Sequence, residues 1–260
     1  MPEGDTILRA ANRIRPVLEG AVPDEIVTPQ ARHARDRWPE RLRGRAVTKV
    51  DTHGKHLFLR FEGDLVLHSH LRMTGAWAVH PHGARWRRAP RRAWLVLRAR
   101  GHEVVEFDGP VLELMTAGRS RFDQRLAALG PDVLAEPVFD DAAFIKRLRA
   151  DDPTRGIGDA LLDQRIVAGL GNIWKAEGCW GAQLDPWRRV RDVSDAAALA
   201  VIADVRPRMI AAAESPSRHG TDRHVYDRAG RPCPRCGVRI EARGQGDDNR
   251  TTYWCPGCQR

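Results

Sequence analysis

Pro2 and Glu3 are the residues whose types and spacing suggest covalent chemistry. If Met1 is removed, as a small second residue permits, the chain begins with the secondary amine of Pro2. A chain-terminal amine has a pKa of about 8, against about 10.4 for lysine, so more of it is unprotonated near neutral pH. Such an amine can attack a carbonyl-like carbon to form an iminium, and the adjacent Glu3 carboxylate can move protons. The alternative is an ordinary disordered start, or a helix cap with proline in the first turn.

Four cysteines near the end of the chain form a second candidate site. They make two Cys-x-x-Cys pairs, separated by eighteen residues, at Cys233, Cys236, Cys255 and Cys258. This spacing is typical of tetrahedral zinc. Because four thiolates leave no coordination position for water, the pattern predicts one structural Zn²⁺ that stabilises a unit too small to fold on its core alone.

The segment between the two pairs predicts a β-hairpin with Arg250 at its tip. Thr251 and Tyr253 would then point away from Thr252 and Trp254. An arginine at a hairpin tip can enter a groove or bind a phosphate. A solvated surface arginine is the alternative.

A glycine-containing loop ends at Asn172 and opens a helix. Apolar sequence of helical character from Leu161 leads into Gly169-Leu170-Gly171-Asn172. Glycines allow the backbone to approach a phosphate, and free N–H groups at a helix start favour an anion. Asn172 can cap the helix and donate a side-chain N–H outward. A simple turn between two helices is the alternative.

Two further residues lie at strand ends. Lys55, one of only four lysines, lies in a turn between strands and could place a cation near the Pro2 amine. Met73 follows another strand and could wedge into a base stack from which a nucleotide has been extruded. The alternatives are a solvated turn lysine and a partly buried core methionine.

The elements that must position these residues change character along the chain. After Gly4 an amphipathic helix is predicted, ending near Gly20. From about residue 44 the apolar period is two, and short strands are predicted at 46–51, 57–61, 65–70, 76–80, 93–98 and 103–107. Such strands indicate a β-sandwich or barrel, against which the first helix would anchor Pro2.

The remainder of the chain is predicted to be helical up to the cysteine pairs. Helices are expected at 140–150, 157–162, 173–178 and 195–213. The sequence therefore predicts an α+β protein with an N-terminal β-sandwich flanked by helices and a helical second domain. The expected domains cover residues 1–130, 131–220 and 221–260.

Composition bounds the partners. The 260 residues include 43 Lys and Arg against 34 Asp and Glu, a net charge of +9. This balance favours a polyanionic partner, although a codon bias toward arginine would give the same excess. No apolar run could span a bilayer and no signal-peptide pattern is present, so we expect no membrane partner. The cysteine usage is typical of a reducing compartment, which predicts a cytoplasmic protein.

These motifs, in this order, resemble the formamidopyrimidine-DNA glycosylase and endonuclease VIII family, in particular its endonuclease VIII branch. The resemblance covers essentially the whole chain, and it is carried by residues 2–4, 52–57, 69–77, 129–132, 163–173 and 253–259.

The resemblance implies a bifunctional DNA glycosylase and AP lyase of base excision repair that removes oxidised bases, pyrimidines in particular. Pro2 would form a Schiff base with sugar C1′, and β,δ-elimination would cleave the strand. Glu3 would open the sugar ring by donating a proton, and Lys55 would be a phosphate and proton-transfer partner. The resemblance also implies that residues 1–130 form the catalytic domain, 131–220 a DNA-binding helix-two-turn-helix domain and 221–260 a zinc finger. It further implies a monomer that acts on duplex DNA in the nucleoid.

The resemblance assigns DNA contacts as well. Gly171, Asn172 and Arg250 would bind phosphates that flank the flipped nucleotide, and Met73 would help to fill the gap. Cys233, Cys236, Cys255 and Cys258 would bind the zinc.

Two departures from the family pattern leave alternatives open. Thr6, preceded by Asp5, stands where family members commonly carry a second glutamate. The Arg and Phe that the purine-directed branch adds to its wedge are not evident within residues 108–125, which favours pyrimidines. One alternative is a non-catalytic protein that binds damaged or abasic DNA. Another is a zinc-ribbon regulator that reads DNA sequence.

Overall fold

The computed structural model describes residues 2–34, 36–215 and 223–260. The chain forms two compact units. One contains Pro2 and Thr6–Ala127, and the other contains Glu3–Asp5 and Ala128–Arg260. Met1 and the expected domain boundary at 220/221 lie outside the described residues.

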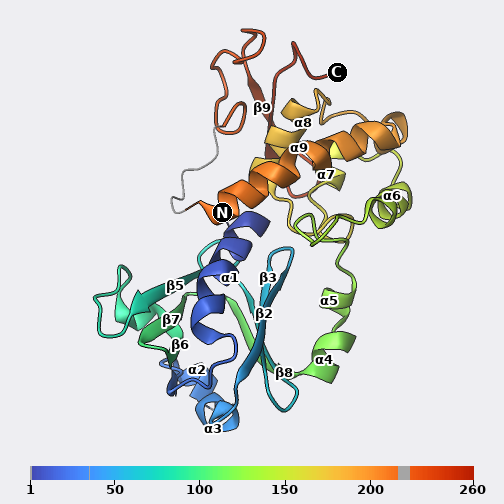
Figure 1. The fold of residues 1–260 in the computed structure, drawn as a ribbon. Coiled ribbons are helices and arrows are strands. Elements are labelled where there is room, and N and C mark those ends of the chain that lie inside the picture. Colours follow the sequence, from blue (N-terminus) through green and yellow to red (C-terminus); the bar gives the residue numbers. More distant parts are fainter. Residues whose placement is uncertain (1, 35, 216–222) are drawn as a thin grey trace. The chain divides into compact units, whose positions relative to one another are not determined.

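The first unit is a β-sandwich, as predicted (Figure 1). One antiparallel sheet has the order β1-β6-β7-β5 and the other β2-β3-β4-β8. The strands are β1 Glu25–Val27, β2 Val47–His53, β3 His56–Phe61, β4 Leu65–His70, β5 Ala76–Pro81, β6 Ala93–Ala99, β7 His102–Phe107 and β8 Val111–Thr116. Apolar side chains from both sheets, such as Leu59, Leu67, Leu97 and Val104, form one buried core.

Helix α1 (Gly4–Leu18) contributes to the same core. Ile7, Ala11, Ile14 and Leu18 are buried at the helical spacing expected of one apolar face. The helix ends before Gly20, whose φ of 72° suits a residue without a side chain. The short helices of this unit are α2 Ala31–Ala34, α3 Trp38–Leu42, η1 Pro90–Arg92, α4 Ala117–Phe122 and α5 Gln124–Ala127.

Two turns of the sandwich lie at the same end of one sheet. His56, which opens β3, pairs with His70, which closes β4. The β2–β3 turn that carries Lys55 and the β4–β5 turn that carries Met73 are therefore neighbours in the first unit.

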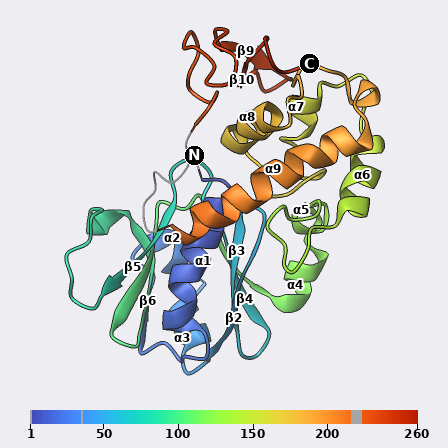
Figure 2. The same cartoon turned by 45° about the horizontal axis from the view of Figure 1, so that its top comes forward.

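The second unit combines helices with a β-hairpin (Figure 2). Its elements are α6 Asp141–Arg149, α7 Ile157–Ala160, α8 Asn172–Gly181, η2 Val190–Asp192, α9 Asp195–Glu214, β9 Glu241–Gln245 and β10 Arg250–Trp254. Helix α8 packs against α9 so closely that a Cβ at Gly178 would lie 2.4 Å from Val205 Cγ1.

The apolar stretch before Asn172 is not helical, contrary to the sequence-based prediction. Helix α7 ends at Ala160, and residues 161–171 form turns. Gln164 explains the difference, since its side chain donates to the carbonyls of Leu162 and Leu170 and accepts from the Gly169 N–H. Side-chain bonds of this kind replace the backbone ladder of a helix.

Among the described residues, none of the helices combines the length and the apolar character that crossing a membrane requires.

Candidate active site

The Glu3 carboxylate lies at the N-terminus of helix α8. Its Oε1 accepts the Ile173 N–H at 2.9 Å and its Oε2 accepts the Trp174 N–H at 3.3 Å, with only 1% of the residue exposed. The first N–H groups of a helix have no intrahelical partner, and the helix dipole there favours negative charge. Glu3 is thus bound to a helix that lies 170 residues later in the sequence. This contact fixes the residue that directly follows Pro2.

Gly171 provides the space for this carboxylate. A Cβ on Gly171 would lie 2.2 Å from Glu3 Cδ, and a Cβ on Gly4 would lie 3.1 Å from the backbone of Gly169. The Gly4 N–H also donates to the Gly169 carbonyl at 2.9 Å. The glycines of this loop therefore admit the start of the chain.

The helix cap predicted for Asn172 is wrong. Gly171 is the N-cap residue and makes no side-chain cap bond, while Asn172 is the first residue of α8. The N–H groups that a capping side chain would satisfy are satisfied by Glu3 instead.

Pro2 is half-buried and lies outside helix α1, which begins at Gly4. The interpretation of Pro2 as the first-turn proline of a helix is therefore wrong. Thr6, where the resemblance predicts a second glutamate, and the preceding Asp5 both lie in the first turn of α1.

Asn172 and the hairpin of Arg250 lie side by side. The Asn172 side chain, 6% exposed, donates from Nδ2 to the Thr251 carbonyl at 2.8 Å. Arg250 precedes Thr251 and opens β10 immediately after the turn, while Thr252 and Trp254 are buried as the alternation predicted. The second unit thus brings Glu3, Gly171, Asn172 and the start of β10 to one end of α8.

Lys175 is a buried cation that sequence reasoning missed. Its Nζ donates to Thr252 Oγ1 at 2.5 Å, and Thr252 in turn donates to Gln245 Oε1 at 2.8 Å. Burial lowers the pKa of Lys175 to about 8, and the positive charge of Arg250 acts in the same direction. The sequence does contain a signal for this residue, because Lys175 is one of only four lysines and lies three residues after Asn172. Its contacts join α8 to the hairpin.

Glu177, also missed, attaches the segment before the cysteines to α8. Its carboxylate accepts the N–H groups of His224, Val225 and Tyr226. Burial raises the pKa of Glu177, but these backbone hydrogen bonds outweigh it and hold the pKa below the usual range. The carboxylate therefore fixes where the C-terminal segment begins relative to Asn172.

The four predicted cysteines converge. Their Sγ atoms all lie within 4.8 Å of one another, with 3.8 Å between Cys233 and Cys258 and 3.4 Å between Cys236 and Cys255. Zinc–sulfur bonds of about 2.3 Å in a tetrahedron place sulfurs about 3.8 Å apart, so the cluster fits this metal. Trp180 Nε1 donates to Cys233 Sγ at 3.3 Å, as outer-shell donors do at metal sites.

Cys179 is fully buried on α8 and does not belong to the cluster, as predicted. Burial raises the pKa of its thiol to about 12, so the thiol stays neutral. It behaves as a small core residue.

In the first unit, Met73 is exposed to 65% in the β4–β5 turn, so its interpretation as a core residue is wrong.

Lys55 is partly buried, and its charge contributes to the lowered pKa of His70. His56, which directly follows Lys55, has its Nδ1 at 2.8 Å from His68 Nε2. Burial is the main cause that lowers the pKa of His56 to about 2 and of His70 to about 4, so these rings are neutral at pH 7.

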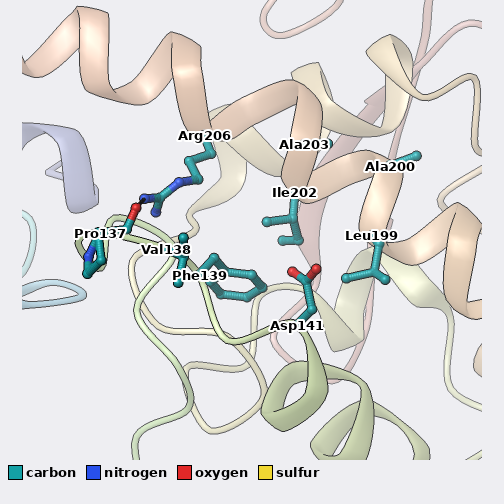
Figure 3. Close-up of a pocket in the computed structure, with 9 residues that line it drawn as sticks. All are labelled: Pro137, Val138, Phe139, Asp141, Leu199, Ala200, Ile202, Ala203 and Arg206. Atoms are coloured by element: carbon teal, nitrogen blue, oxygen red, sulfur yellow. Dashed lines mark hydrogen bonds between the residues drawn. The ribbon is translucent and has the colours of Figure 1, made fainter.

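A separate pocket lies between α9 and the segment before α6 (Figure 3). Val138, Phe139, Leu199 and Ile202 make most of it apolar. Its one cation, Arg206, donates to the carbonyls of Val133 and Ala135. This pocket contains none of the predicted site residues.

Two family models match most of the chain. The formamidopyrimidine-DNA glycosylase N-terminal domain matches residues 1–120, and the formamidopyrimidine-DNA glycosylase H2TH domain matches residues 129–221. The chain is 40% identical over 268 residues to probable endonuclease 8 2 of Streptomyces coelicolor, covering all of this chain and 94% of that protein. It is 36% identical over 269 residues to the DNA-(apurinic or apyrimidinic site) lyase Nei2 of Mycolicibacterium smegmatis, covering 100% and 99%.

A solved structure has the same fold. The formamidopyrimidine DNA glycosylase of Lactococcus lactis, bound non-covalently to DNA containing an AP site, superposes with a TM-score of 0.83. The two sequences are 23% identical, and each chain is covered completely.

Proposed function

The chain belongs to the formamidopyrimidine-DNA glycosylase family, and from that premise we propose that it is a DNA glycosylase with AP lyase activity in base excision repair. The observation that carries the proposal is the buried Glu3 carboxylate at the N-terminus of α8. It places the residue next to Pro2 at the same helix end as Asn172 and the Arg250 hairpin. A carboxylate and an amine held beside a phosphate-binding helix end suit chemistry on a DNA sugar.

In the proposed mechanism Met1 is removed and the Pro2 nitrogen attacks C1′ of the damaged nucleotide. The C1′–base bond breaks, Glu3 donates a proton that opens the sugar ring, and an iminium forms between Pro2 and C1′. The two N–H bonds from α8 stabilise the Glu3 anion that donation leaves behind. The iminium acidifies the adjacent sugar C–H, so the 3′ phosphate leaves by β-elimination and the 5′ phosphate by δ-elimination. Water then releases the amine.

The remaining predicted residues bind DNA in this proposal. Asn172, Arg250 and the backbone at Gly171 contact phosphates on either side of the extruded nucleotide, and Lys55 contacts another phosphate. Met73, apolar and exposed, fills the gap that the nucleotide leaves. The net charge of +9 supports a polyanionic partner, which we propose to be duplex DNA bound by a monomer within the nucleoid.

Zinc is the metal that we propose for the four cysteines. It would supply a structural cross-link rather than a reactive centre, because four thiolates complete the coordination. Cys233, Cys236, Cys255 and Cys258 would hold it, and the position of the Arg250 hairpin would then depend on the metal.

We propose oxidised pyrimidines as the preferred bases. Within residues 108–125 the adjacent Arg121 and Phe122 lie in α4, which follows the last residue of β8. The first residue of β8, Val111, pairs with His70 near the Met73 turn. A six-residue strand spans about 20 Å, so Arg121 and Phe122 lie at the opposite end of β8 from the Met73 turn. We therefore propose that they do not extend the wedge.

A non-catalytic protein that binds abasic DNA is the second candidate, and Thr6 in place of a second carboxylate favours it. Borohydride trapping on duplex DNA with an AP site separates the two. The enzyme is expected to form a covalent complex and to cut the strand, whereas chains that retain Met1, in which the Pro2 nitrogen is an amide, should do neither. Tight binding by the parent protein without trapping or cleavage would instead support the second candidate.

A further inference from the structure

The turn that carries Met73 is braced by a loop to which no function was assigned from the sequence. Residues 82–92, here called the arginine strap, connect β5 to β6. Trp86 anchors the strap. Its ring packs edge-on against the Phe107 ring, with the two ring centroids 5.5 Å apart, and its Nε1 donates to Glu103 Oε2 at 2.7 Å. The strap is therefore attached to the outer side of the sheet and is not a free loop.

Beyond Trp86 the strap reaches the residue that follows Met73. Arg88 Nη1 donates to the Thr74 carbonyl at 3.1 Å and lies 3.2 Å from Asp108 Oδ2. Thr74 Oγ1 donates to the Asp108 carbonyl at 3.1 Å, and Arg92 Nε lies 2.6 Å from the same Asp108 carboxylate oxygen. Thr74 is thus held at both its carbonyl and its hydroxyl.

The turn itself is tight. The Gly75 N–H donates to the Leu71 carbonyl at 2.9 Å, and a Cβ on Gly75 would lie 2.8 Å from that oxygen. Arg72 has a left-handed φ of 46°, and its N–H donates to His70 Nδ1. Both sides of Met73 are therefore fixed while its side chain remains exposed.

We propose that Arg88 and Asp108 are positioning residues that pre-organise the Met73 turn for insertion into the DNA stack. The inference rests on the wedge role proposed above for Met73. If the Met73 turn had to become ordered during binding, the cost in conformational entropy would weaken DNA binding and slow insertion. A turn that is already held in place avoids this cost. The side chains of Arg88 and Asp108 are 29% and 22% exposed, and ion pairs this close to solvent contribute little to stability. Their removal should therefore affect insertion more than folding.

The test uses a duplex with a tetrahydrofuran abasic analogue and 2-aminopurine opposite it, whose fluorescence reports insertion without any cleavage. Arg88→Gln should slow insertion about tenfold, the effect of losing a hydrogen bond to a charged group. Arg87→Gln, at an exposed neighbour on the same strap, is the matched control and should insert at the parent rate. Met73→Ala should abolish the signal, and the Arg88→Gln/Met73→Ala double variant should match Met73→Ala.

Thermal unfolding separates positioning from folding. Arg88→Gln should melt within about 2 °C of the parent protein. If it does not fold, Asp108→Asn replaces it, because asparagine accepts the left-handed φ of 49° at this position. Insertion at the parent rate in a folded brace variant would overturn the inference. Cleavage of an AP-site duplex by the parent protein is measured separately, so a failure of the proposed enzymatic function would be visible on its own.

Discussion

Replacement of Glu3 by glutamine tests the contact on which the site depends. Glutamate has two side-chain oxygens, and one accepts the Ile173 N–H while the other accepts the Trp174 N–H. Glutamine replaces one of these oxygens by an amide NH₂, so in the same geometry one of the two N–H groups faces a donor. A buried donor left without a partner costs about 1–3 kcal/mol. Loss of the negative charge at the N-terminus of α8 adds about 0.3–1 kcal/mol. Glu3→Gln should therefore destabilise the second unit by about 1–4 kcal/mol.

In a unit of this size such a loss lowers Tm by about 4–16 °C. Differential scanning calorimetry measures it, with Glu214→Gln, the same change at an exposed position of this unit, as the control. Single-turnover excision of an oxidised base should also fall far more than cleavage of a preformed AP site, which needs no ring opening by Glu3. A Glu3→Gln protein that melts like the parent would refute the helix-terminus argument. Equal losses in both reactions would refute the proton-donor role.

Three further outcomes follow from the same structure. Elemental analysis should find one zinc per chain in the parent protein and in Cys179→Ala but none in Cys236→Ser, and equal zinc in all three would contradict the four-cysteine site. The pKa values of His56 and His70, about 2 and 4 in the folded chain, lie below the unfolded value of about 6.5. The unfolded chain therefore binds these protons first, and urea unfolding should show stability that is complete above pH 6.5 and falls toward pH 4, less steeply in His56→Gln. The pKa of Lys175, about 8, lies below the unfolded value of about 10.4, so stability should rise with pH between 8 and 10.4. Lys175→Met should lose this rise, and an unchanged pH profile would exclude a buried ammonium.

The local features of the fold could be predicted from the sequence, whereas long-range ones could not. The apolar spacing of α1 and the period of the inner strands are local patterns, and both predictions are confirmed. Strand β1 has three residues and depends on its pairing with β6. Strand β8 was missed because both of its faces bury apolar side chains, Leu112 inward and Met115 outward, which removes the alternation.

The candidate site shows the same division. The spacing of the two Cys-x-x-Cys pairs is a local pattern, and it predicts that the four thiols converge on one metal site. Docking of Glu3 on α8 joins residues 170 apart, and no local pattern encodes it. Lys175 and Glu177 were missed because charged residues in a helix usually face solvent, and only tertiary packing buries these two.

Mass spectrometry of the borohydride-trapped complex identifies the amine that bonds to the DNA sugar. The parent protein is incubated with an AP-site duplex, reduced, digested, and sequenced to find the nitrogen that carries the deoxyribose remnant. We expect an adduct on the Pro2 nitrogen of a chain that lacks Met1. An adduct on Lys55 or on another lysine, or trapping by chains that retain Met1, would contradict it.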